Sequence, residues 1–165
     1  MNHIGKLTRY KGWANRLLFA EVAKLPEEAL VAPQTIIFGN LLRTLNHVFA
    51  MDFVWQSHLL GKPHGLQTRN PDFCPTFEEI RAAQPEMDTW YIDYADALTP
   101  PERDEVVHFQ FIGGNPGAMT REDILLHAVQ HGIYHRGHVA QMLRGHPITV
   151  PTTDYPVYLK TLHQA

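Results

Sequence analysis

The sequence predicts an all-α protein folded as an up-down-down-up four-helix bundle. Apolar residues recur at three- and four-residue steps in four long segments, which is the spacing of amphipathic helices. Thr-x-x-acid patterns at Thr76 and Thr120 mark two helix starts. A stretch rich in glycine, proline and asparagine separates the second and third segments. Four long helices with one extended crossover are typical of bundles, whose interiors commonly hold metal sites.

The first two helices are predicted at about 4–24 and 38–60. Each carries a regular apolar stripe, and each is followed by residues that end helices: Pro26 after the first, Gly61 and Pro63 after the second. The length of the second helix suits a bundle. Its stripe includes Leu41, Leu42, Leu45, Val48, Phe49, Phe53, Val54 and Trp55.

The segment 61–75, GKPHGLQTRNPDFCP, is predicted to be a long ordered loop before the third helix. Thr76 and Glu79 have the spacing of a capping box, so the third helix is expected from Thr76 to about Leu98. Pro85 falls inside this pattern. It predicts either a kink or a helix that starts later than Thr76.

Residues 105–120 are predicted to form a short hairpin. The segment is rich in β-branched and aromatic residues, and Gly113-Gly114-Asn115-Pro116-Gly117 is a turn signal. A fourth helix then runs from Thr120 to about Leu143 and ends before Gly145 and Pro147. One short helix is expected in the tail, after Pro151.

Composition indicates a globular protein with a single domain over residues 1–165. The chain is 44% hydrophobic and 19% charged, and no apolar run approaches the roughly 18 residues of a membrane span. The net charge is −3 and the basic residues are scattered, which argues against nucleic acid as a partner. Because the N-terminus lacks the features of a signal peptide, we expect a cytoplasmic location. Cys74 is the only cysteine, so an internal disulfide and a multi-thiolate zinc site are both excluded.

Histidine is the abundant type of metal ligand in this sequence. The chain has 11 histidines, and His131 and His135, four residues apart on one helix, can both reach one ion. A third ligand has to come from a facing helix, and His47 lies on the inward stripe of the second helix. Three histidines with an open fourth position are the pattern of a catalytic metal site, because a structural zinc site usually fills all four positions.

Spacing alone supports a second interpretation equally well. Histidine pairs four residues apart also occur by chance on solvated faces, particularly in a histidine-rich chain. His127 and His138 share the same broad helix face, but each lies about 10–12 Å along the axis from the farther member of the pair. They are therefore expected to surround a metal site, to line a pocket or to lie on the surface, rather than to hold the ion.

Three segments together resemble the DinB family: YKGWANRLL, LRTLNHVFAMDFVWQSHLLG and LLHAVQHGIYHRGHVAQMLR. The resemblance covers nearly the whole chain and includes the hairpin and the late Asp154-Tyr155-Pro156. It implies a four-helix bundle whose metal is held by one histidine of the second helix and two of an HxxxH segment. These positions map onto His47, His131 and His135. The ion that this resemblance implies is divalent; we expect zinc or nickel, and imidazole also suits iron, copper or manganese.

The remaining site residues are expected by position only. His127, His138, Tyr134 and Arg136 are predicted to line a substrate pocket, and no general base can be singled out among His127, His138, Tyr134 and Asp52. Arg136 belongs to an HRG triplet that is typical of the family. Its guanidinium is expected to brace a neighbouring carboxylate, to bind a substrate anion, or simply to lie on the surface and stabilise the helix.

The resemblance leaves two classes of function open. The wider superfamily includes S-transferases and isomerases that use bacterial low-molecular-weight thiols, which favours a metal-dependent enzyme, either thiol-dependent or hydrolytic, acting on a small molecule. Similar folds host unrelated chemistry, so a metal-containing damage or stress-response protein without catalysis is the alternative. The resemblance also suggests a homodimer.

Overall fold

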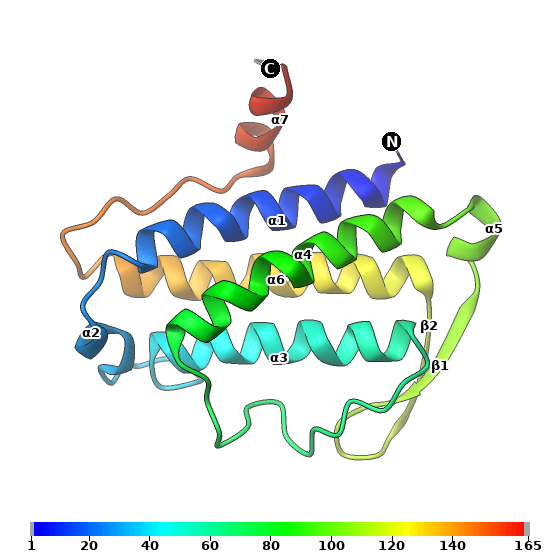
Figure 1. Cartoon of the computed structure of the whole chain (residues 1–165), viewed down its shortest axis with the longest axis horizontal. Coiled ribbons are helices and arrows are strands. Elements are labelled where there is room, and N and C mark those ends of the chain that lie inside the picture. Colours follow the sequence, from blue (N-terminus) through cyan, green and yellow to red (C-terminus); the bar gives the residue numbers. More distant parts are fainter. Residues whose placement is uncertain (1, 164–165) are drawn as a thin grey trace.

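The computed structural model describes residues 2–163 and is dominated by four long helices (Figure 1). These are α1 (His3–Val22), α3 (Leu41–Leu59), α4 (Phe77–Ala97) and α6 (Arg121–Leu143). Ion pairing of Arg9 with Asp96 and stacking of Phe19 on Phe77 show that α1 and α4 run in opposite directions. The cross-bundle contact of His47 with His131 and that of Arg121 with the Leu59 carbonyl show the same for α3 and α6. Arg136 of α6 donates to Asn15 of α1, and a Cβ at Gly132, four residues earlier on α6, would lie 3.8 Å from Cε of Lys11, four residues earlier on α1. Thus α1 and α6 run in the same direction, and the predicted up-down-down-up bundle is confirmed.

Side-chain caps set the starts of the long helices close to the predicted positions. Thr76 and Glu79 form the predicted capping box at the start of α4. Asn40 caps α3 by accepting a hydrogen bond from the Arg43 backbone N–H. The second helix therefore begins at Leu41, three residues later than predicted, because Gly39 before the cap has a positive φ of 79° that ends the helical path.

Pro85 lies inside α4, which nevertheless runs from Phe77 to Ala97. The prediction of a later start is therefore wrong. Pro85 is exposed, and so is Arg81, whose carbonyl loses its helical donor. The hydroxyl of Thr89, one turn further along α4, donates to the Pro85 carbonyl.

Short elements connect the long helices. The predicted hairpin is present as β1 (Val106–Gln110) paired antiparallel with β2 (Pro116–Thr120), and the tail contains the predicted short helix α7 (Tyr155–His163). Two further short helices, α2 (Glu27–Val31) and α5 (Pro100–Arg103), were not predicted. Between residues 2 and 163 there are thus seven helices.

The centre of the bundle is polar, whereas apolar clusters lie around it. Lys11 is completely buried and donates to the carboxylates of Asp52 and Asp88, with both nitrogen–oxygen distances 2.7 Å. Asn15 and Gln84 also donate to these carboxylates. We call these five side chains the buried polar network. It joins α1, α3 and α4, and Arg136 of α6 donates to its Asn15.

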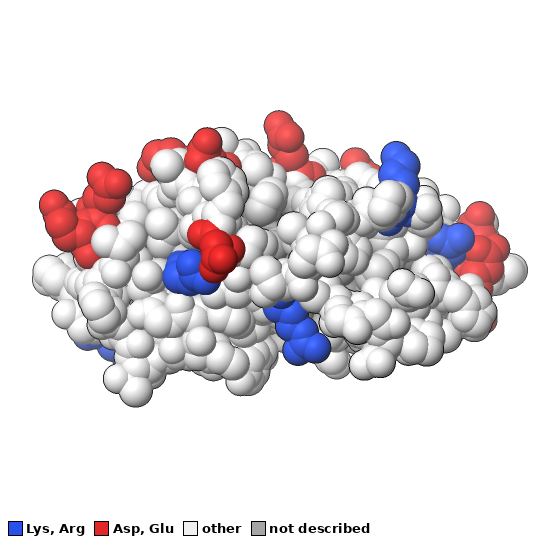
Figure 2. All heavy atoms as spheres, turned by 90° about the horizontal axis from the view of Figure 1, so that it is seen from below, with Lys and Arg blue, Asp and Glu red and all other residues white. Residues whose placement is uncertain are grey.

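Charge is sparse on the face beneath α3 and the loop that follows it. Figure 2 shows this face with isolated basic residues and with acidic residues mostly along one edge. No basic patch is visible there. In the part of the chain that the structure describes, no helix has the length and hydrophobicity that a membrane crossing requires.

Candidate metal centre

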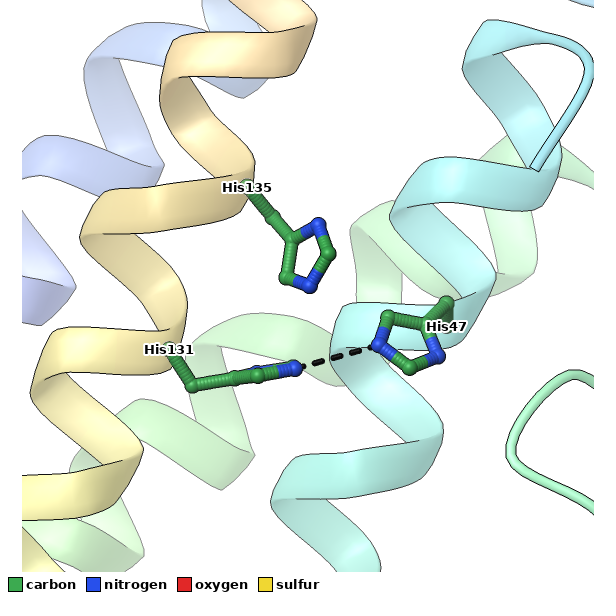
Figure 3. A group of neighbouring side chains, drawn as sticks. All are labelled: His47, His131 and His135. Carbon is green, nitrogen blue, oxygen red and sulfur yellow. Dashed lines mark hydrogen bonds between the residues drawn. The ribbon is translucent and has the colours of Figure 1, made fainter. Parts of the chain in front are cut away.

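Three histidines converge between α3 and α6. His47 comes from α3, and His131 and His135 come from successive turns of α6 (Figure 3). One ring nitrogen from each lies within 4.8 Å of the others. The Nε2 atoms of His47 and His131 face each other at 3.1 Å. The structure therefore brings together the three residues that were predicted as metal ligands.

The outer nitrogens of the cluster are held in two of the three rings. Nδ1 of His47 lies 2.7 Å from the backbone carbonyl of Arg69, which can only accept, so Nδ1 carries the proton and Nε2 presents a lone pair. Nδ1 of His135 lies 3.2 Å from Nδ1 of His138. Nδ1 of His131 is buried and has no hydrogen-bond partner among residues 2–163. Fixing the outer nitrogen of a histidine is how proteins orient metal-binding imidazoles.

The geometry fits a cation better than it fits three free imidazoles. Two neutral rings that both direct Nε2 lone pairs at each other repel, and a proton shared between them serves only one pair. A divalent ion accepts lone pairs from all three rings at once. With three nitrogens from the protein, positions remain for water or another small ligand.

Burial keeps the three imidazoles neutral. Burial, together with the neighbouring His135 and His47 rings, lowers the pKa of His131 to about 2. Burial and the rings of His47 and His138 lower the pKa of His135 to about 4. Burial also lowers the pKa of His47, against the opposing effect of its bond to the Arg69 carbonyl. Neutral imidazole is the form that binds metal, so the cluster is ready to bind at neutral pH.

These lowered pKa values predict that the metal-free protein becomes less stable in mild acid. Below pH 6.5 histidines of the unfolded chain bind protons, whereas His135 of the native state stays neutral down to about pH 4. The free energy of unfolding therefore falls as the pH falls. Each such histidine costs about 1.4 kcal/mol per pH unit. Urea unfolding of metal-free protein between pH 7 and pH 5 measures this slope. His131→Ala should make this slope shallower by up to about 1.4 kcal/mol per pH unit. An unchanged slope would contradict the lowered pKa of His131.

The other predicted pocket residues divide into two groups. His127, Tyr134 and His138 border the cluster: the His127 ring stacks 5.8 Å from that of His131, and the Tyr134 ring lies 4.9 Å from that of His135. Arg136 instead points into the bundle, where it is 6% exposed and donates to the side-chain oxygen of Asn15. Its guanidinium also lies over the Tyr10 ring, 5.4 Å from the centroid.

Asp52, a candidate general base by position, faces away from the histidines into the buried polar network. It is 1% exposed and accepts from Lys11 and Gln84. Within residues 2–163 it makes no hydrogen bond to an imidazole, and it is not solvated. Burial raises the pKa of Asp52, and Lys11 opposes that effect.

Sequence reasoning missed two contributors to the site. Phe38, in the turn before α3, stacks on His47 with ring centroids 4.0 Å apart and lies 5.6 Å from His135. Arg69, in the long loop before α4, contributes only its carbonyl. An aromatic residue close to a helix N-cap carried a weak signal for Phe38. A backbone carbonyl has no side-chain signature, so nothing in the sequence pointed to Arg69.

Comparison with known proteins agrees with this architecture. The model described as the DinB family matches residues 1–164. Protein DinB of Bacillus subtilis (strain 168) is 28% identical over 165 residues, covering 93% of this chain and 92% of that protein. The crystal structure of a DinB-like protein from Bacillus cereus ATCC 10987 superposes with a TM-score of 0.64 at 20% identity, covering 87% of this chain and 90% of that one. The structural likeness supports the shared fold.

Proposed function

Because the chain belongs to the DinB family, we propose that it holds one divalent metal ion on His47, His131 and His135 and acts as a metal-dependent enzyme on a small molecule. One observation carries the proposal: three neutral imidazoles, two of them buried and that of His131 half-buried, bring ring nitrogens within 4.8 Å of one another. Such a ligand set leaves positions open for a substrate, as in catalytic rather than structural sites.

A divalent ion bound there supplies Lewis acidity, which activates water or a thiol. Residues of the chain would orient the ligands, exclude water and bind the substrate. The Arg69 carbonyl keeps His47 in the tautomer that binds metal. Phe38 covers His47 and His135 and excludes water from that side. Tyr134 is 62% exposed beside His135, where its hydroxyl can donate a hydrogen bond to a bound substrate.

Two reactions suit such a site: transfer of a low-molecular-weight thiol to an electrophile, and hydrolysis of a small substrate. The kinship of the family favours the thiol reaction. Zinc or nickel is the proposed ion, since three neutral imidazoles suit both. The proposed working form is a cytoplasmic homodimer that binds neither membranes nor nucleic acid.

The burial of the cluster favours one alternative. His47 and His135 are each only 4% exposed, and restricted access suits a metal-containing damage or stress-response protein without catalysis. The two functions make different demands on the ion. A catalytic ion must exchange its small ligand for substrate, whereas a non-catalytic ion needs no access.

Elemental analysis of untagged protein tests the metal site directly. We expect about one equivalent of a divalent metal per chain. The metal-loaded protein is then assayed with a panel of electrophiles in the presence of bacterial thiols, and with ester, amide and phosphoester substrates. Turnover that disappears on chelation and returns on adding metal supports the enzyme. Stoichiometric metal without turnover in either panel would favour the non-catalytic protein, and protein free of metal would refute both.

A further inference from the structure

A groove of about 600 Å³ lies on the other side of the bundle from the histidine cluster. It runs along α1 and α4 and is closed on one side by the last two turns of α7. None of the three clustered histidines lines it. Its volume lies in the range of small-molecule sites, which are roughly 300–1,000 Å³.

The bottom of the groove forms where α1 and α4 approach closely. A Cβ added at Gly12 would lie 3.3 Å from the Asp88 Cβ and 3.7 Å from the Ile92 Cδ1, so glycine permits this approach. Asp88 belongs to the buried polar network and already accepts hydrogen bonds from Lys11 and Asn15. The floor therefore presents no unpaired carboxylate to a ligand.

The walls of the groove are mainly apolar and aromatic. Trp13 from α1 and Ile92 from α4 line it on opposite sides, and Leu162 of α7, 44% exposed, lines the third side. The Trp13 ring packs against that of Tyr158, which also lines the groove, with ring centroids 5.5 Å apart. Such walls suit the flat or aliphatic body of a small organic molecule.

Two guanidinium groups lie toward one end of the groove. Arg16 follows Gly12 by four residues on α1, and Arg81 precedes Asp88 by seven on α4; because the helices are antiparallel, both lie in the same direction from the Gly12 crossing. Arg16 is exposed and makes no ion pair or hydrogen bond with any residue that the structure describes. Guanidinium groups bind carboxylates and phosphates through paired hydrogen bonds.

Acidic side chains pair only weakly with these two arginines, so this end of the groove stays cationic. Arg81 pairs with Glu78 one turn earlier, but the side chains are 49% and 73% exposed, and such surface pairs contribute only about 0–1 kcal/mol. At the far end, Arg9 is held by both oxygens of Asp96. The Arg9 guanidinium is therefore occupied by its ion pair between α1 and α4, whereas Arg16 and Arg81 can bind a ligand.

We propose that this groove is a second binding site, for a small organic anion. The apolar body of the ligand lies against Trp13, Ile92 and Leu162, and its carboxylate or phosphate group pairs with Arg16 and Arg81. Charge complementarity selects an anion over a neutral or cationic molecule of the same shape. The site is independent of the metal centre and of the function proposed for it.

Binding of 2-naphthoate to the metal-loaded, full-length protein tests the proposal. Calorimetry gives the dissociation constant, and the indole N–H signal of Trp13, assigned with Trp13→Phe, reports the place of binding. We expect saturable binding that moves this signal, and binding at least about tenfold weaker for the neutral 2-naphthamide, the equivalent of one charge-assisted hydrogen bond. Comparison with 2-naphthyl phosphate shows which anionic group the arginines prefer.

Substitutions in the groove separate this site from the metal centre. Arg16→Gln should weaken naphthoate binding about tenfold, whereas Arg144→Gln, at an exposed position that does not line the groove, should leave it unchanged. Ala20 is exposed and lines the groove one turn beyond Arg16. The carboxylate of Ala20→Glu should pair with the Arg16 guanidinium and weaken naphthoate binding, whereas the neutral Ala20→Gln should not.

Three results would overturn the proposal. The first is equal binding of the amide and the acid, and the second is an Arg16→Gln variant that binds as the parent does. The third is a dimer, detected by sedimentation, that Ala20→Glu dissociates, because a second copy of the chain would then cover the groove. Arg16→Gln changes no metal ligand, so failure here leaves the metal proposal untouched.

Discussion

Replacing Lys11 with methionine should destabilise the protein by roughly 3–5 kcal/mol, the usual cost of removing one partner from a buried ion pair. The Lys11 side chain is 0% exposed and those of Asp52 and Asp88 are 1% and 8% exposed. Without the ammonium group, two carboxylates remain close together out of water. Oδ1 of Asp52 already lacks a hydrogen-bond partner within residues 2–163, so the network has no reserve donor.

The pH dependence of this loss identifies its cause. Burial already raises the pKa of Asp52, and removing Lys11 takes away the charge that opposes the rise. The native variant then binds protons that the unfolded chain does not, so its stability decreases as the pH rises through the raised pKa. Urea unfolding should therefore show a larger difference from the parent at pH 8 than at pH 5.

Lys24→Met is the matched control for Lys11→Met. Lys24 also pairs with a carboxylate, that of Glu21, but its side chain is 57% exposed, so the change should cost less than about 1 kcal/mol. Adding Asp52→Asn to Lys11→Met should recover part of the stability, because it removes one of the stranded charges. If Lys11→Met unfolds at the same urea concentration as Lys24→Met, removing Lys11 does not destabilise the protein as predicted.

His131→Ala should lower the affinity for a divalent metal by more than about a hundredfold. Loss of a partner that only orients a ligand already costs 10- to 100-fold, and loss of a ligand removes a bond to the ion itself. The His131 ring contacts both other rings of the cluster, with centroids 5.0 Å from His47 and 4.4 Å from His135. Competition with a chromophoric chelator measures the affinity, and circular dichroism of the metal-free variant shows whether the fold is kept.

Neighbouring histidines provide a graded control. His138 lies against the outer nitrogen of His135, so His138→Ala should give an intermediate loss, about 10- to 100-fold. His127 stacks near His131 but lies outside the cluster, and His127→Ala should bind metal nearly as the parent does. A loss for His127→Ala as large as that for His131→Ala would show that the ligands are wrongly assigned.

Helices and hairpin could be predicted because their signals are local. The Thr76–Glu79 capping box and the glycines of the hairpin turn act on their own backbone, as does the spacing of apolar residues. Pro85 shows the limit of local rules. Whether a proline interrupts a helix depends on whether the carbonyl that loses its donor is buried, and exposure of Pro85 depends on how α4 packs.

The sequence by itself determined the four-helix class and placed His131 and His135 on one helix face, because residues four apart share a face whatever the surroundings. Resemblance to a family added weight to His47. Only the tertiary structure decided that Lys11, Asp52 and Asp88 form a buried ion network, that Arg136 turns inward, and that Phe38 and the Arg69 carbonyl hold His47. These contacts join residues far apart in the chain, and the sequence does not fix which charged side chains are removed from water until the helices pack.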